Sequence, residues 1–342
     1  MKDMGKCLII INKNAGTSKK ITFEKVERFI NHNYLYTHIT LPCDVPIPYE
    51  KYNAVAICGG DGTLSSIMKN VWDKNVKVYY FPVGTLNDKA KASKHFHKSA
   101  QDMQANNLVV GKVFSNEQLK LTQNRELSNI SYCANEQICK QEKRCVRDNL
   151  KCSDIELCTS AQDNNYELFT YVFACGSFTP IGYCSSVEKK KKLGILAYIL
   201  NVVKEYKPHK IPAKIKTEKI DIQGDFTLLM FIKSPRCFGF SFNKAYNAQD
   251  KSGHLIAIRT PKHKSALGYI EMFFPFFRVF FMGLKKEIIG KNLIFTKTSN
   301  ANIQLFNNVD FCADGEKCTL DKGEYKISFH RSKCYFQVAD KF

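Results

Sequence analysis

Short apolar runs alternate with helix-like segments in the first third of the chain. Runs of strand length occupy residues 7–11, 54–58 and 76–81, and residues 22–31 carry apolar positions at helical spacing. Strands that are apolar throughout, with helices between them, predict a parallel sheet covered on both faces. The loops that follow these three strands then lie at the carboxyl ends of the sheet, where parallel sheets bind ligands.

After about residue 108 the pattern changes to short β-rich segments separated by polar turns. It predicts a mainly antiparallel β-sandwich as a second domain. One helix is expected within this domain, over residues 193–203, directly after a basic run at 189–192. The segments with the β-rich pattern are 169–175, 226–232, 255–259, 293–296 and 325–329.

Residues 272–282 are rich in phenylalanine and open to two interpretations. The stretch is shorter than the ~20 apolar residues that cross a bilayer, and Pro275 and Arg278 interrupt it. One interpretation is a helix or strand of the core. The other is a segment at a membrane interface, because Lys285 and Lys286 follow the aromatic side chains.

The composition is that of a globular protein with a strongly basic surface. The 342 residues suffice for two domains, and 44% of them are hydrophobic. The chain has 51 Lys and Arg against 32 Asp and Glu, which gives a net charge of +19. This charge favours an anionic partner, either nucleic acid or an acidic lipid leaflet; the alternative is that it only reflects a lysine-rich proteome.

The 14 cysteines are expected to be reduced. No signal peptide precedes the first apolar run, so we expect a cytoplasmic protein. Five cysteines cluster within residues 133–158, but they lack the close pairs that zinc ligands usually form. We therefore interpret them as plain thiols, at Cys133, Cys139, Cys145, Cys152 and Cys158.

The clearest chemical signal is a glycine-rich turn between the strand at 54–58 and a helical pattern that starts at Leu64. Glycines let the backbone approach an anion, and the free N–H groups of a first helical turn point at it. A carboxylate within the turn could also hold a metal ion on bound phosphates. The turn consists of Gly59, Gly60, Asp61, Gly62 and Thr63.

Two further motifs place polar side chains on tight turns. Residues 82–88 read Pro-Val-Gly-Thr-Leu-Asn-Asp, and residues 314–316 read Asp-Gly-Glu. The first could surround a nucleotide triphosphate and its magnesium together with Asp61, whereas the second, taken alone, is a common hairpin turn. A GxxxxGK[ST] loop and a GxGxxG fingerprint are both missing at the strand ends, which argues against a P-loop enzyme and a dinucleotide oxidoreductase.

In their order and spacing, these motifs resemble those of the diacylglycerol kinase catalytic-domain family. This family includes bacterial soluble lipid kinases, sphingosine kinases and ceramide kinases, and the chain is most similar to the bacterial single-unit type. Residues 9–16 resemble the opening strand and nucleotide loop of the family. Residues 191–198 resemble its Lys-Lys-x-Gly-x-x-Ala-Tyr helix. The resemblance therefore spans nearly the whole chain.

The resemblance implies a two-domain kinase that binds ATP in the cleft between its domains. The first domain would be an α/β nucleotide-binding domain at residues 1–108, completed by a tail at about 331–342. The second would be a β-rich lipid-substrate domain at residues 109–330. An insertion around residues 117–165 contains the cysteine cluster.

The resemblance also implies roles for individual residues. Glu316, helped by Asp314, would be the general base near the lipid hydroxyl, which agrees with what phosphoryl transfer requires. Asp61 would organise Mg²⁺ through bound ATP. The residues implied in ATP binding are Asn12, Gly16, Thr40, Gly59, Gly60, Asp61, Gly62, Thr63, Gly84, Thr85, Asn87 and Asp88.

These roles predict an ATP-dependent kinase that phosphorylates a hydroxyl of diacylglycerol or a related lipid. The expected partners are this lipid and an anionic membrane surface, on which the basic charge would hold the cytoplasmic enzyme peripherally. Nucleic acid is not expected, because no reader motif accompanies the basic run at 189–192. A homodimer is left open.

Two alternatives to a lipid kinase stay open. NAD kinases also use Gly-Gly-Asp-Gly-Thr, so an NAD kinase-like enzyme is one. The family usually has Asn-Glu where Ser65 and Ser66 stand, so a non-catalytic homologue that binds nucleotide or membrane is the other. The family also usually has Phe where Lys89 stands. In some relatives an Asp-Gly turn binds a structural magnesium ion, and the matching turn here is Ser252-Gly253.

Overall fold

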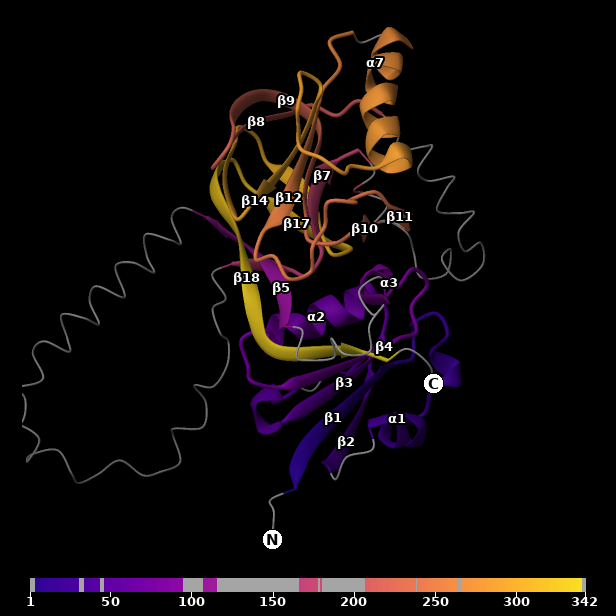
Figure 1. Ribbon diagram of the computed structural model, residues 1–342. Coiled ribbons are helices and arrows are strands. Elements are labelled where there is room, and N and C mark those ends of the chain that lie inside the picture. Colours follow the sequence, from indigo (N-terminus) through magenta and orange to yellow (C-terminus); the bar gives the residue numbers. More distant parts are fainter. Residues whose placement is uncertain are drawn as a thin grey trace, which may run out of the picture.

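The computed structural model describes residues 4–30, 34–43, 46–94, 107–115, 166–177, 179, 207–237, 239–263 and 266–339. It places a parallel sheet with helices below a mostly antiparallel β-rich part (Figure 1). Four predicted features lie outside the described residues: the helix at 193–203, the basic run at 189–192, the insertion at 117–165 and the cysteine cluster at 133–158.

The N-terminal part contains four parallel strands in the order β4-β3-β1-β2. Successive residues of β1 alternate between two apolar cores, with Leu8 and Ile10 on the face of α2, and Cys7 and Ile9 on the face of α1. Burial on both faces explains why the strands read as continuous apolar runs. The elements are β1 (Gly5–Asn12), α1 (Phe23–Ile30), β2 (Tyr34–Leu41), β3 (Ala54–Gly59), α2 (Asp61–Val71), β4 (Lys77–Pro82) and α3 (Asp88–Lys94), with short 3₁₀ turns at Ser18–Lys20 and Tyr49–Lys51.

The last strand, β18 (Gly323–Val338), joins the two parts of the molecule. Its first half pairs antiparallel with β15 and β5, and its end, from Tyr335 to Val338, pairs parallel with Lys77 to Tyr80 of β4. Figure 1 shows this strand, in yellow, descending from the β-rich part and bending into the lower sheet. The C-terminal residues thereby extend the parallel sheet, while the domain boundary near residue 108 stays a prediction.

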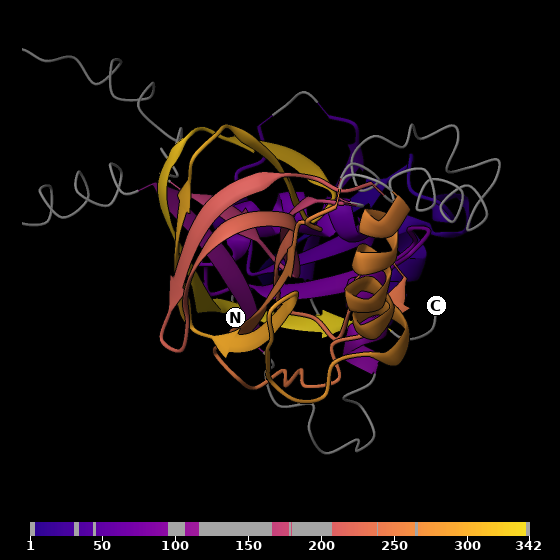
Figure 2. The same cartoon turned by 90° about the horizontal axis from the view of Figure 1, so that it is seen from above.

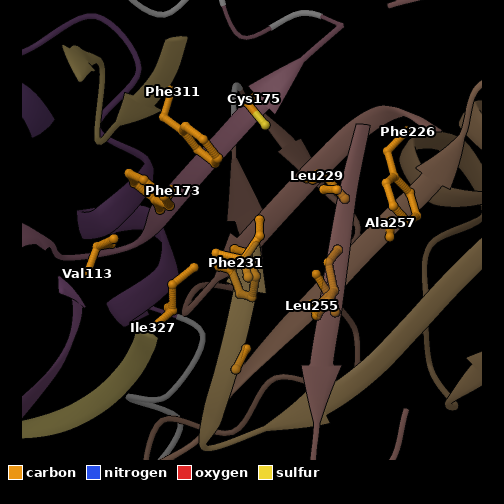
Figure 3. Packing of buried hydrophobic residues seen from close by; sticks show 14 of the residues in the cluster. Val113, Phe173, Cys175, Phe226, Leu229, Phe231, Leu255, Ala257, Phe311 and Ile327 are labelled. Atoms are coloured by element: carbon orange, nitrogen blue, oxygen red, sulfur yellow. The ribbon is translucent and has the colours of Figure 1, made fainter. Parts of the chain in front are cut away.

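The β-rich part is built on a large apolar core enclosed by its strands (Figure 3). Phe173, Phe311 and Phe231 are fully buried in it, and the rings of Phe173 and Phe311 stack with centroids 4.3 Å apart. Its strands are β5 (Asn107–Ser115), β6 (Glu167–Phe169), β7 (Val172–Gly176), β8 (Ile211–Thr217), β9 (Asp221–Ile232), β12 (Gly253–Arg259), β13 (Ile288–Ile289), β14 (Leu293–Thr298), β15 (Asn300–Leu305), β16 (Val309–Ala313) and β17 (Glu316–Leu320).

A helix covers the outer face of this β-rich part. Helix α7 (Ala266–Phe277) runs into a π-helical turn, η4 (Arg278–Met282), and Figure 2 shows α7 standing outside the strands. Met272, Phe276 and Val279 pack on the outward residues of β9 in a second apolar core. Beside η4 lies the small hairpin β10 (Arg236–Cys237) and β11 (Phe240–Ser241). In the described part of the chain, no helix has the length and apolarity needed to cross a membrane.

The predicted fold class is confirmed: a parallel α/β region precedes a mostly antiparallel β-rich region. The strand predictions at 7–11, 54–58 and 76–81 correspond to β1, β3 and β4. Strand β2 and helix α3 were not predicted, because neither shows a clear apolar period. Residues 272–282, interpreted as core or as interface, form the end of α7 and η4.

Candidate active site

Three loops meet at the carboxyl ends of β1, β3 and β4. Gly60 lies in the loop after β3, and Gly84 lies in the loop after β4. A side chain on Gly84 would place its Cβ only 2.5 Å from the Cα of Gly60, so glycine is needed where these two loops touch. The loop after β4 is braced by Asn87, which has a φ of +50°. Its Oδ1 accepts a hydrogen bond from the N–H of Gly84 (2.9 Å), and its Nδ2 donates to the carbonyl of Gly84 (2.8 Å).

The N-terminus of α2 has backbone N–H groups without partners within the helix. Gly60 caps the helix without a side-chain hydrogen bond, and the first helical bond runs from the N–H of Leu64 to the carbonyl of Gly60. The N–H groups of Gly62 and Thr63 precede that bond, so the helix itself does not satisfy them. Asn12, at the end of β1, donates from Nδ2 to the Thr63 hydroxyl at 2.8 Å. The geometry fits a phosphate group at this helix end.

Asp61 holds the next helix. Its Oδ2 accepts from the N–H of Asp88 (2.8 Å) and its Oδ1 from the N–H of Lys89 (3.1 Å), so its carboxylate caps the start of α3. Burial, and then the charge of Asp88, raise the pKa of the Asp61 carboxyl to about 6. The predicted role of Asp61 in magnesium binding stays a prediction, and contact with a metal ion would use the lone pairs that the cap leaves available.

Asp88 ties the parallel sheet to the β-rich part. Its carboxylate is buried and accepts from Arg236 Nε at 2.9 Å and from the N–H of Gly239 at 2.9 Å. The Arg236 side chain is itself mostly buried and also donates to the carbonyl of Gly239. The carboxylate predicted to touch ATP is therefore engaged with the β10–β11 hairpin.

Asp314 is a structural anchor. It sits in the two-residue turn between β16 and β17, where Asp314 and Gly315 both have positive φ, as a tight hairpin turn requires. Its buried carboxylate accepts the hydroxyl of Ser65 at 2.8 Å and the backbone N–H groups of Thr170, Tyr171 and Val172. With four donors on two oxygens, this carboxylate holds the turn against α2 and the start of β7.

Glu316 lies at the mouth of the site. It is exposed at the start of β17, two residues after the anchored Asp314. Its Oε1 lies 3.5 Å from the point that a Cβ on Gly62 would occupy, so the carboxylate faces the N-terminal turn of α2. The structure thus brings together the glycine turn and the distant Asp-Gly-Glu motif.

Lys89 is a buried cation whose role the sequence did not indicate. Its Nζ donates to the carbonyl of Thr170 at 2.9 Å. Burial lowers the pKa of Lys89 to about 8, while the charges of Asp314 and Asp61 oppose this shift. An ammonium therefore balances the buried carboxylates, a role that Phe could not fill.

The remaining predicted contacts lie at the rim of the site. Gly16 is packed against the loop after β4, since a Cβ on Gly16 would lie 3.2 Å from the carbonyl oxygen of Val83. Thr85 is exposed in that same loop. Thr40 lies on the edge strand β2, where it pairs with Ile11 near the end of β1.

A second buried ammonium lies near the Ser252-Gly253 turn. Lys233 Nζ donates to the carbonyls of Asn247 (2.9 Å), Asp250 (2.6 Å) and Ser252 (2.9 Å). Burial, and then the charge of Lys89, lower the pKa of Lys233 to about 7, while the charge of Asp250 opposes this shift. A lysine ammonium thus gathers the oxygens of this loop. Within the described residues, no group of three or more His, Cys, Asp or Glu side chains could hold a metal ion.

Comparison with known proteins agrees with the motifs. Residues 6–114 match the model of the diacylglycerol kinase catalytic domain. No curated protein matches the chain. Three solved structures from Bacillus anthracis str. Sterne resemble it along its length.

One of these structures is described as a diacylglycerol kinase, with a TM-score of 0.55, 13% identity, and coverage of 98% of this chain and 97% of that one. The other two are candidate diacylglycerol kinases, both 14% identical, with TM-scores of 0.60 and 0.59. The alignment with a TM-score of 0.60 covers 98% of this chain and 97% of the other protein. The alignment with a TM-score of 0.59 covers 99% of both chains. At this identity the likeness shows the fold. The resemblance predicted from the motifs is thus confirmed: residues 6–114 match the diacylglycerol kinase catalytic domain, and the chain has the fold of structures from that lipid kinase family.

Proposed function

We propose that this protein is an ATP-dependent lipid kinase that phosphorylates a hydroxyl of diacylglycerol or a related lipid. The observation that carries the proposal is the position of Glu316, which is exposed and whose carboxylate faces the N-terminal turn of α2. A phosphate at that helix end and a base beside it are the two things that phosphoryl transfer to an alcohol needs.

ATP is the phosphate donor that the kinase family implies. The N–H groups of Gly62 and Thr63 would take phosphate oxygens, and the partial positive charge of the helix end would stabilise them. The loop from Asn12 to Gly16 and the exposed Thr85 would complete the nucleotide site from either side. Asp61 would hold Mg²⁺ on the bound phosphates, and the ion would supply positive charge there.

Glu316 is the proposed general base. As the lipid hydroxyl attacks, its O–H bond breaks and the proton passes to the Glu316 carboxylate. The hydroxyl oxygen forms a new bond to the γ-phosphorus, and the bond from that phosphorus to the bridging oxygen breaks to release ADP. Asp314 does not take part in the proton transfer; its four hydrogen bonds hold the turn that presents Glu316.

The substrate and its location follow from the same proposal. A diacylglycerol or related lipid stays in a membrane, so the enzyme would work as a cytoplasmic protein held at the membrane surface. The net charge of +19 supports attraction to an anionic leaflet.

A turnover assay with product identification tests this proposal. Purified protein, ATP and Mg²⁺ are incubated with a lipid extract, with diacylglycerol micelles and, separately, with NAD, and mass spectrometry identifies the phosphorylated product. We expect a phosphorylated lipid. Phosphorylation of NAD alone would replace the proposal with an NAD kinase-like activity. No magnesium-dependent turnover of any acceptor would favour a non-catalytic homologue.

A further inference from the structure

We propose that the outward side of α7 and η4 docks on anionic membranes by inserting aromatic side chains into the lipid interface. We call this surface the aromatic face. It deepens the proposed function, on which it rests, by naming the surface that brings a lipid kinase to its substrate. Its members are Leu267, Tyr269, Ile270, Phe273, Phe274, Phe277, Phe281 and Met282, all exposed.

The aromatic face is a continuous side of one helical segment. Phe273, Phe277 and Phe281 follow each other at four-residue spacing, which places them on the same side of the helix. Their rings stack in sequence, with centroids 5.5 Å apart between the first two and 5.4 Å apart between the last two. Figure 2 shows α7 outside the strands of the β-rich part.

The core does not account for these side chains. Met272, Phe276 and Val279 already fill the contact with the sheet, on the opposite side of the helix. The ring-bearing residues of the aromatic face keep much of their area in water, with exposed fractions of 50% for Phe273, 66% for Phe274, 41% for Phe277 and 70% for Phe281. A contiguous exposed patch of large apolar side chains marks a surface that binds a partner.

Charge selects an anionic membrane as that partner. Residues 262–286 contain five basic residues and a single acidic one, Glu271. Glu271 is engaged with the His263 ring at 2.6 Å and with the N–H of Lys262 at 2.9 Å. Aromatic side chains flanked by cations suit the interface of an anionic bilayer. A second copy of this chain, also at +19, is repelled from such a basic surface. The basic residues are Lys262, Lys264, Arg278, Lys285 and Lys286.

The aromatic face is connected to the candidate active site. Phe240 of β11 contacts the ring of Phe281, with centroids 6.1 Å apart, and β11 pairs with β10. Arg236 of β10 binds Asp88 at the start of α3. The β10–β11 hairpin therefore links the docking surface to the loop that follows β4. Docking by this face would hold the candidate active site close to lipid hydroxyls.

Vesicle flotation tests the docking surface without relying on catalysis. The full chain is mixed with vesicles of phosphatidylcholine, with or without phosphatidylglycerol. The wild type should float with the anionic vesicles, and less so at high salt. The double variant Phe274→Ser with Phe281→Ser should bind them about tenfold more weakly or worse, because two rings no longer enter the interface. The variant Leu35→Ser is the matched control, since Leu35 is 51% exposed on the distant strand β2.

A second arm separates docking from the kinase proposal. On a short-chain diacylglycerol dispersed as monomers, the double variant should turn over at the wild-type rate, while on anionic vesicles it should lose activity. Vesicle binding by the aromatic face without phosphorylation of any lipid would sink the kinase proposal and leave docking intact.

Equal flotation of wild type and double variant would overturn docking, as would failure of the wild type to float. A wild-type dimer that the double variant converts to monomer, without vesicle binding, would assign the face to a second copy instead.

Discussion

The hydroxyl of Ser65 in α2 donates a 2.8 Å hydrogen bond to the carboxylate of Asp314, which lies 249 residues further along the chain. This bond joins the helix that follows the glycine turn to the hairpin that carries Glu316. The residue that departs from the family pattern thus helps to assemble the candidate site. The departure at Ser65 is no reason in itself to regard the candidate site as inactive.

Ser65→Ala should destabilise the protein and lower its activity. The change removes one of the four donors to a buried carboxylate, and hydrogen bonds to charged groups contribute ~1.5–3 kcal/mol. Urea unfolding should therefore show a loss in that range. Ser66→Ala is the control, because Ser66 is exposed on the same helix. Equal unfolding free energies for the two variants would contradict the anchoring role of Ser65.

Arg236→Ala should weaken the junction between the two parts of the molecule. The buried Asp88 carboxylate accepts from Arg236 Nε and from the N–H of Gly239, and the change removes the first of these two donors. Breaking a buried ion pair from one side costs about 3 kcal/mol or more. Thermal unfolding measures this loss, with Arg331→Ala as the exposed control. Equal melting temperatures for Arg236→Ala and Arg331→Ala would show that the ion pair contributes less than about 3 kcal/mol.

Lys89 should make stability depend on pH in the alkaline range. Its pKa is about 8 in the folded protein against an ordinary value of 10.5, so the unfolded chain binds more protons between these values. Stability from this group therefore rises with pH in that window. The free energy of unfolding of the wild type, relative to Lys89→Met, should increase by roughly 1 kcal/mol between about pH 8 and about pH 9.

The control for Lys89 lies on the same helix. Lys91 is exposed, so Lys91→Met should show the same pH dependence as the wild type. Urea unfolding at the two pH values measures all three proteins. A constant difference between wild type and Lys89→Met would show that Lys89 keeps an ordinary pKa.

Lys233→Met should loosen the loop at Asn247–Ser252. The change removes Lys233 Nζ, which donates hydrogen bonds to three carbonyl oxygens of this loop. An unsatisfied buried polar group costs ~1–3 kcal/mol. We expect a loss of about 3 kcal/mol in unfolding free energy and faster amide hydrogen exchange in this loop. Lys251→Met, exposed in the same loop, should change neither quantity. Unchanged exchange in Lys233→Met would show that the loop is held by other contacts.

The sequence predicted the parallel sheet and the meeting of its loops well. Continuous apolar strands and the glycine turn are local signals, and the close approach of Gly84 to Gly60 leaves no room for a side chain on Gly84. Ser65, Lys89 and Lys233 were not assigned their roles, because their partners are distant in sequence. Phe276 and Phe277 are adjacent, yet one is buried and the other exposed, so composition alone could not separate core from surface in α7.

The transfer rate of Glu316→Gln tests the central claim most directly. Initial rates of ATP-dependent lipid phosphorylation are compared for the wild type, Glu316→Gln and Ser66→Ala, with ATP affinity and melting temperature measured in parallel. Removal of a general base should slow transfer by ~10²–10⁴-fold, while ATP affinity and melting temperature stay near those of the wild type. A Glu316→Gln protein that phosphorylates lipid at the wild-type rate would contradict the account.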